Sequence, residues 1–279
     1  MKVALEIPPN FGKDLESGKG PEVLASLDGA MPFRAETTRG YLQLMAQSYA
    51  AEQVARGRST TVPNVPVKLE SRFRYNQAFK SVYAIIPGII MMLLMNIPAM
   101  MTALGVVREK ETGSIANFRS TPITGVEFLL GKQLPYVAIA LVSFGSLLLL
   151  AVFLFGVPVT GSFAALLAGV FVYVCAATGF GLLISCFTTT QVAAIFAASV
   201  LTITPCANFS GLLVPVSALS GASQVISYGY PAGWFMQISL GAFTKRLGFI
   251  DLWPDLAMLV GFAVLFVVVA VAALPKQEA

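Results

Sequence analysis

The longest charge-free run in the chain limits its fold more than any other feature. No Asp, Glu, Lys or Arg occurs between Gln133 and Thr244, a stretch of 112 residues. Two shorter charge-free runs cover Ser81–Val107 and Leu256–Pro275. A soluble domain carries about 25% charged residues, whereas this chain carries 11% and has a mean hydropathy of +0.77. Apolar runs of about 18 residues or more are typical of membrane spans, so the sequence predicts an α-helical polytopic membrane protein.

The charged residues divide the chain into two parts. Residues 1–80 hold 19 of the 32 charged residues, and residues 81–279 hold the other 13. We expect 1–80 to form a small α/β portion with a linker, with strands at 3–7, 23–27 and 67–75 and a helix at 35–56. We expect 81–279 to form a transmembrane domain with about five spans, each able to cross a hydrocarbon core of about 30 Å. The predicted spans are 81–105, 131–155, 163–186, 191–213 and 254–274.

The segment between the fourth and fifth predicted spans has a different pattern. Residues 214–253 are apolar but are interrupted by several Pro and Gly residues, and they include Lys245 and Arg246. Irregular backbone at membrane depth is tolerated only where protein or a cavity shields it. The pattern therefore predicts one or two short interfacial or re-entrant helices and not a sixth full span.

Several classes of enzyme are excluded by missing residues. The chain has no histidine, which excludes His-based acid/base catalysis, His metal ligation and a Ser-His-Asp triad. The stretch nearest to a nucleotide-binding loop, Gly125 to Lys132, has five residues between its glycines where the loop needs four, and Gln133 follows in place of Ser or Thr. Basic residues do not cluster with aromatic residues, so we expect no nucleic-acid binding. We expect no cofactor and no catalysis by this chain alone.

A polar island at residues 108–132 holds seven of the thirteen charges of the membrane part. Each charge at the bilayer centre costs about 2.5–3.5 kcal/mol on insertion scales, so the island must lie at or outside the lipid headgroups. We expect a short helix on the membrane surface, a turn at Thr121-Pro122 and a helix that re-enters the membrane. Thr124 and Glu127 have the spacing of a capping box for this re-entry helix.

The island also carries a family resemblance. The run Val107–Ile115, together with Ser120–Pro122 and Leu130–Tyr136, resembles the signature loop of type-2 ABC transporter permeases of the multidrug-efflux-like export branch. Three further stretches agree, so the resemblance covers essentially the whole chain: Phe73–Asn76 followed by Ile86–Gly88, Ile7–Phe11, and Gly211–Ser217.

The resemblance implies a topology. The family has six spans, with a large external domain between the first and second. We therefore expect this chain to begin inside that domain, without the first span and part of the domain. Counting Lys and Arg residues near the spans gives five on one side and six on the other, which leaves the orientation open. The resemblance implies that the protein lies in the cell (inner) membrane with the N-terminal portion outside and the C-terminus in the cytoplasm.

The resemblance also implies partners and site residues. The partners are a cytoplasmic ABC ATP-binding subunit, a second permease copy or paralogue, the lipid bilayer and, as a further option, a periplasmic adaptor. The mechanism implied is alternating access. The residues expected to couple to the ATPase are Arg108, Glu109, Lys110, Glu111, Gly113, Ser114 and Ile115. The residues expected to shape the loop and the re-entry helix are Thr121, Pro122, Glu127, Gly131 and Lys132.

The transport path is less clearly marked. Asn96, beside Pro98, and Asn208, after Pro205, are the best candidates to line it. No ionisable residue lies deep in a predicted span, which disfavours a proton-coupled transporter and favours a hydrophobic or amphipathic substrate, such as a drug or a lipid.

Two other functions stay open at this point. The chain could be a non-transporting membrane scaffold or assembly protein in which the 108–132 island only connects two spans. It could also be an integral-membrane enzyme, although the island is the one group of titratable residues near a membrane face. Charge reversal at Glu109 and Glu111 is expected to separate the first alternative from the exporter.

Overall fold

The computed structural model describes residues 3–11, 13, 22–28, 32–55, 68–74, 82–113, 125–213, 216 and 219–273. The chain divides into two compact units, Met1–Ala84 and Ile85–Ala279. The predicted turn at Thr121-Pro122 lies outside the described residues.

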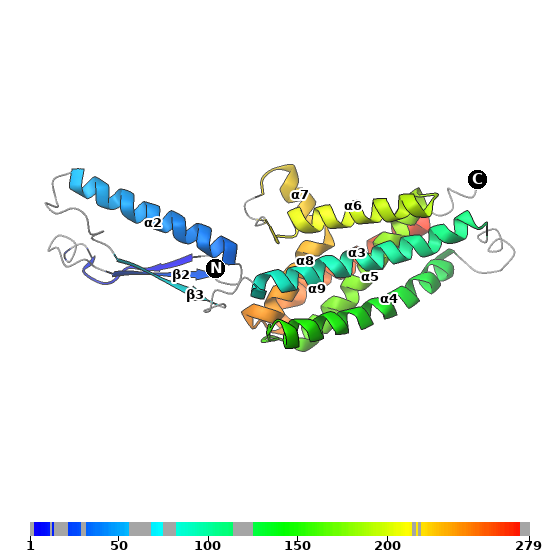
Figure 1. The fold of residues 1–279 in the computed structure, drawn as a ribbon, viewed down its shortest axis with the longest axis horizontal. Coiled ribbons are helices and arrows are strands. Elements are labelled where there is room, and N and C mark those ends of the chain that lie inside the picture. The colour runs from blue at the N-terminus through cyan, green and yellow to red at the C-terminus, as the bar shows by residue number, and fades with distance from the viewer. Residues whose placement is uncertain are drawn as a thin grey trace. The chain divides into compact units, whose positions relative to one another are not determined.

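The N-terminal unit contains a three-stranded sheet and one long helix. The strands are β1 (Val3–Glu6), β2 (Glu22–Asp28) and β3 (Lys68–Arg74), in the order β1-β2-β3. β1 runs antiparallel to β2, and β2 runs parallel to β3. The helix α2 (Pro32–Ala55) lies on one face of this sheet (Figure 1). Ala25 and Leu27 of β2 are buried, as expected for alternate residues on the covered face of a sheet.

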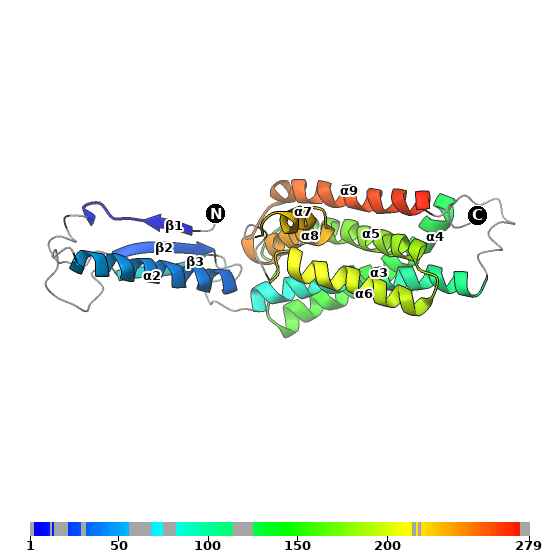
Figure 2. The same cartoon turned by 90° about the horizontal axis from the view of Figure 1, so that it is seen from above.

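The second unit has five helices long and apolar enough to span a membrane. They are α3 (Val82–Glu111), α4 (Gly125–Leu149), which continues into a π-helical turn η2 (Leu150–Leu154), α5 (Phe163–Phe187), α6 (Gln191–Phe209) and α9 (Phe249–Ala273). They run side by side along one direction (Figures 1 and 2). The predicted polytopic helical fold with five spans is therefore confirmed.

α5 is the most deeply buried of the five long helices. Its glycines allow close approach of its neighbours: a methyl group on Gly181 would overlap the backbone of Ala99 in α3, and one on Gly169 would lie 2.9 Å from Ile238. A side-chain hydrogen bond adds to this packing. The Tyr173 hydroxyl donates to the carbonyl of Met91 in α3 at 3.1 Å. Small residues at helix contacts are the usual way for membrane helices to maximise dispersion contact.

The segment between α6 and α9 forms two short helices, as predicted. They are α7 (Ala222–Tyr228) and α8 (Pro231–Leu240), and a π-helical turn η4 (Gly241–Lys245) follows. α8 is largely buried, and its Phe235 ring stacks on Tyr173 of α5 with centroids 4.2 Å apart. The amides of Thr160 and Gly161 both donate to the carbonyl of Ala242, at 3.0 and 2.8 Å. The two π-helical turns were not predicted.

Candidate functional site at the end of helix α3

The first four residues of the polar island, 108–111, belong to a spanning helix and not to a separate surface helix. The first predicted span ends at residue 105, but α3 continues without a break to Glu111. It ends where Gly113 takes a φ of +72°, while the amides of Thr112 and Gly113 donate to the carbonyls of Arg108 and Lys110. A residue with positive φ is a common helix stop. Residues 108–111 therefore do not contribute to the expected surface helix, because charged residues are good helix formers and prolong the span. The rest of the expected surface helix lies outside the described residues.

Glu109 connects α3 to α4. Its carboxylate forms an ion pair with the ammonium group of Lys132, which lies two turns into α4. The two side chains are 28% and 33% exposed, so the pair is neither fully solvated nor fully buried. The Lys132 ammonium also lies 5.8 Å from the centre of the Phe128 ring. Lys132, which was predicted to anchor the re-entry helix, thus contacts the end of the preceding span through Glu109.

Lys110 connects α3 to α5. Its ammonium group donates a hydrogen bond to the carbonyl of Ser185 at 2.6 Å. Ser185 lies in the last turn of α5, where carbonyl groups lack helical partners and the helix dipole is negative. A cation in this position is stabilised by both effects.

Glu111 connects α3 to α6. Its carboxylate accepts a hydrogen bond from the backbone amide of Gln191 at 2.7 Å and a second one from the Gln191 side-chain amide. Gln191 is the first residue of α6, and Thr190 caps that helix by accepting from the amide of Ala193 at 3.2 Å. An acidic group at a helix N-terminus is favoured by the unpaired amides and the positive end of the dipole.

Three consecutive residues therefore bind three different helices. Successive residues of an α-helix are rotated by about 100°, so Glu109, Lys110 and Glu111 point in different directions from α3. Together with Arg108 and Lys132 we call them the α3 end cluster. The cluster makes the end of α3 a common attachment point for α4, α5 and α6.

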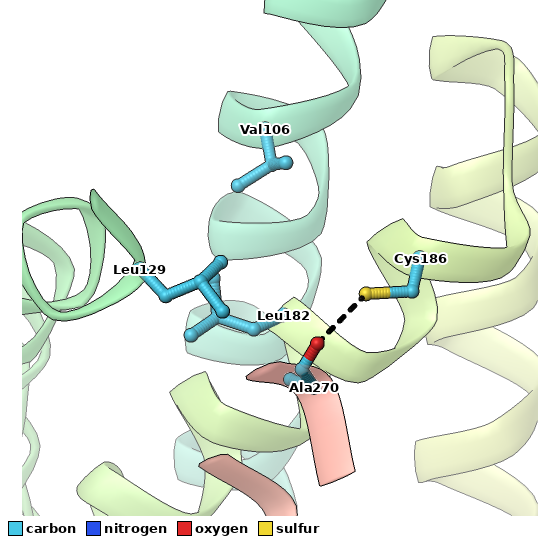
Figure 3. Close-up of a cluster of buried hydrophobic side chains, with 5 residues drawn as sticks. All are labelled: Val106, Leu129, Leu182, Cys186 and Ala270. Atoms are coloured by element: carbon cyan, nitrogen blue, oxygen red, sulfur yellow. Dashed lines mark hydrogen bonds between the residues drawn. The ribbon is translucent and has the colours of Figure 1, made fainter. Parts of the chain in front are cut away.

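Apolar packing supports the α3 end cluster one turn below it. Val106 of α3 packs with Leu129 of α4, Leu182 and Cys186 of α5, and Ala270 of α9 (Figure 3). Val107, the next residue, belongs to a second buried group that joins α3 to α5 and α6. The adjacent residues Val106 and Val107 thus pack in two different buried groups.

The structure describes only some of the remaining predicted site residues. Ser114, Ile115, Thr121 and Pro122 lie outside the described residues. Glu127 is in the first turn of α4, as the predicted re-entry helix requires. Gly113 ends α3 and is exposed, and Gly131 has open space around it.

The two predicted path residues do not come together. The Asn96 side-chain amide donates to the Thr202 hydroxyl at 2.7 Å and so joins α3 to α6. The Asn208 side-chain amide donates to the carbonyl of Thr204 at 3.0 Å, one turn earlier in its own helix. Neither contact demonstrates a path.

One buried polar residue was missed. Gln133 in α4 is 6% exposed, and its amide donates to the Cys175 carbonyl and the Thr178 hydroxyl of α5, both at 2.9 Å. Because Gln133 directly follows Lys132, the sequence suggested the edge of the polar island and not a buried residue of α4. The available signal was its position in the run Leu129, Gln133, Val137, which has the spacing of a single helix face.

Known proteins resemble this chain over nearly its full length. The model of the ABC-2 family transporter proteins matches residues 2–272. The chain is 28% identical over 262 residues to the probable multidrug ABC transporter permease YbhS of Escherichia coli (strain K12), which covers 94% of this chain and 69% of the relative. It is 28% identical over 273 residues to the inner membrane transport permease YhhJ of the same strain, covering 96% and 71%. No solved structure matches. The resemblance seen in the sequence is thus confirmed: the chain belongs to the ABC-2 family of transporter proteins and is a multi-pass membrane subunit of the ABC transporter permease type.

Proposed function

We propose that this chain is the permease of an ATP-driven exporter and that a separate ATP-binding subunit docks beside the α3 end cluster. The observation that carries the proposal is the attachment of Glu109, Lys110 and Glu111 to three different helices. The names of the permease relatives support the transport role, and the family supports association with an ATP-binding subunit and a second permease.

The α3 end cluster suits a part that transmits force. Three charge-assisted contacts join this cluster to α4, α5 and α6, and two buried apolar groups lie about one turn away along α3. A displacement of the end of α3 would therefore move α4, α5 and α6 together and would not be absorbed by one side chain. This property is needed where ATP binding in one subunit must rearrange the helices of another.

The docking surface is proposed to start where α3 ends. Thr112 and Gly113 are exposed, and Ser114 and Ile115 follow them in the sequence. Arg108 lies at the edge of this surface. In this proposal the end of α3 faces the cytoplasm, and the N-terminal portion faces the other side.

The proposed substrate is hydrophobic or amphipathic, moved by alternating access in a permease pair. Apart from residues near their ends, the described spans contain no Asp, Glu, Lys or Arg. A small, highly charged substrate would have no counter-charge in such an interior. Asn96 and Asn208 stay the proposed path residues, and a periplasmic adaptor stays a proposed further partner.

Purification of the tagged permease from its own cells tests the proposal. We expect an ATP-binding subunit to co-purify and the complex, but not the permease alone, to hydrolyse ATP. A bulky Thr112→Trp variant is expected to lose the ATPase. The control is Ala222→Trp, which places the same bulk on an exposed residue of α7, at the other end of the bundle (Figure 1). Unaided ATP hydrolysis by the permease, or equal co-purification with both variants, would contradict the proposal.

A further inference from the structure

A hollow of about 550 Å³ lies between α3 and α4, beside the α3 end cluster. Its walls include Met101, Leu104, Arg108, Glu109, Lys132 and Tyr136. All of these residues belong to two spanning helices. The hollow therefore combines charged groups with membrane-spanning apolar walls.

The hollow carries a net positive charge. Arg108 and Lys132 contribute two cations, and Glu109 contributes one anion that is already paired with Lys132. The Arg108 guanidinium is exposed and makes no hydrogen bond or ion pair within the part of the chain that the structure describes. An arginine without an acidic partner can bind a phosphate group through two parallel hydrogen bonds.

A tyrosine adds a third hydrogen-bond donor. The Tyr136 side chain crosses from α4 to α3, where a methyl group on Gly105 would overlap its hydroxyl oxygen. Gly105 is therefore the residue that allows the ring to lie there. Among the described residues the Tyr136 hydroxyl has no hydrogen-bond partner. Arginine, lysine and tyrosine thus present three kinds of donor to one hollow.

An apolar slot continues from the hollow along the same two helices. It shares Met101 and Tyr136 with the hollow and is lined further along by Ile97, Ile139 and Leu147. Its enclosed volume is only about 20 Å³, so an apolar chain would lie along its mouth and not inside it. Ile97 and Ile139 are 39% and 46% exposed, which leaves both edges of the mouth open to such a chain.

The dimensions fit a molecule with an anionic head and an apolar tail. Ile97 and Arg108 are eleven residues apart in α3, which corresponds to about 16 Å along the helix. A free phosphate would use the donors but not the slot. A soluble protein segment would have to enter between two membrane-spanning helices.

We propose that the α3–α4 hollow binds an anionic phospholipid of the surrounding leaflet. Its phosphate is held by Arg108, Lys132 and Tyr136, and one acyl chain follows the slot toward Ile97. This inference does not depend on the transported substrate or on the ATPase, because lipid binding requires neither.

Native mass spectrometry of the purified full chain, exchanged into micelles with phosphatidylglycerol or phosphatidylcholine, tests the inference. We expect one phosphatidylglycerol to be retained in preference to phosphatidylcholine. Arg108→Gln is expected to weaken retention about fivefold, which corresponds to about 1 kcal/mol per basic residue near a lipid surface. Arg246→Gln is the matched control, because Arg246 is an exposed arginine that follows η4, away from the hollow.

A second variant distinguishes binding of the acyl chain from binding of the lipid headgroup. Ile139→Trp fills the mouth of the slot without changing charge and is expected to lower retention of phosphatidylglycerol but not binding of inorganic phosphate. If Arg108→Gln does not fold, Tyr136→Phe tests the headgroup contact in its place, because it removes only the hydroxyl donor. Equal retention of both lipids, an equal effect of Arg108→Gln and Arg246→Gln, or unchanged retention of phosphatidylglycerol in Ile139→Trp would overturn the proposal. Cross-linking of a photoreactive residue at 136 to a protein in place of lipid would also overturn it.

Discussion

Replacement of Gly181 by alanine is expected to separate α3 from α5. A methyl group at this position would lie 2.9 Å from the carbonyl carbon and 3.0 Å from the Cα of Ala99, and still closer to the carbonyl oxygen. Carbon atoms in contact are normally 3.5–4.0 Å apart, so the helices must move apart by about 0.6–1.1 Å. The obstacle is backbone and cannot rotate away.

The expected cost of Gly181→Ala is about 1–3 kcal/mol, the range for extra methyl groups forced into packed cores. The matched control is Gly145→Ala in α4, where a methyl group meets nothing within 4 Å. There the higher helix propensity of alanine favours a gain of up to about 1 kcal/mol. The two substitutions are chemically identical but are expected to change the stability in opposite directions.

The native cysteines provide the assay. Cys186 and Cys206 are buried free thiols, and Cys175 is partly buried. A maleimide dye that fluoresces on reaction will therefore report unfolding during heating or SDS titration. Gly181→Ala is expected to lower the unfolding midpoint, and Gly145→Ala to keep or raise it. Equal midpoints for Gly181→Ala and the parent chain would refute the close approach of α3 and α5.

Two further substitutions test individual polar side chains. Lys110→Met removes the ammonium group that binds the carbonyl of Ser185, and we expect a loss of about 1.5–3 kcal/mol in SDS unfolding; an unchanged midpoint would mean that the bond contributes nothing. Gln133→Leu removes two hydrogen bonds to α5, but the Thr178 hydroxyl keeps its bond to the Val174 carbonyl at 2.8 Å. We therefore expect a loss of only about 1 kcal/mol, and a loss as large as that of Lys110→Met would contradict this ranking.

The spans could be predicted from sequence because hydropathy depends on each segment alone. The ends of the spans could not, because they depend on partners in other helices. Residues 108–111 were expected outside the first span, yet α3 includes them, since Lys132, Ser185 and Gln191 bind three of them. The fourth span was predicted to reach residue 213, but α6 ends at Phe209 and Gly211 takes a φ of +89°.

The sequence indicated where the candidate site lies, but not which contacts its charged residues make. The alternating charges at 108–111 suggested a surface that receives a partner. In the structure, Glu109 and Glu111 are already bonded to other helices of the same chain. Reversal of their charges would disturb helix packing as well as docking, so the exposed Thr112 is the better position for a docking test.

Cross-linking from a cysteine at residue 112 tests the central claim most directly. Thr112→Cys in native membranes, treated with a bifunctional thiol reagent, is expected to give an adduct with an ATP-binding subunit and to react with an impermeant maleimide only from the cytoplasmic side. Ala222→Cys, exposed at the other end of the bundle, is expected to give no such adduct and to react from the opposite side. Labelling of Thr112→Cys from outside the cell, or an ATPase adduct formed equally from both positions, would contradict the account.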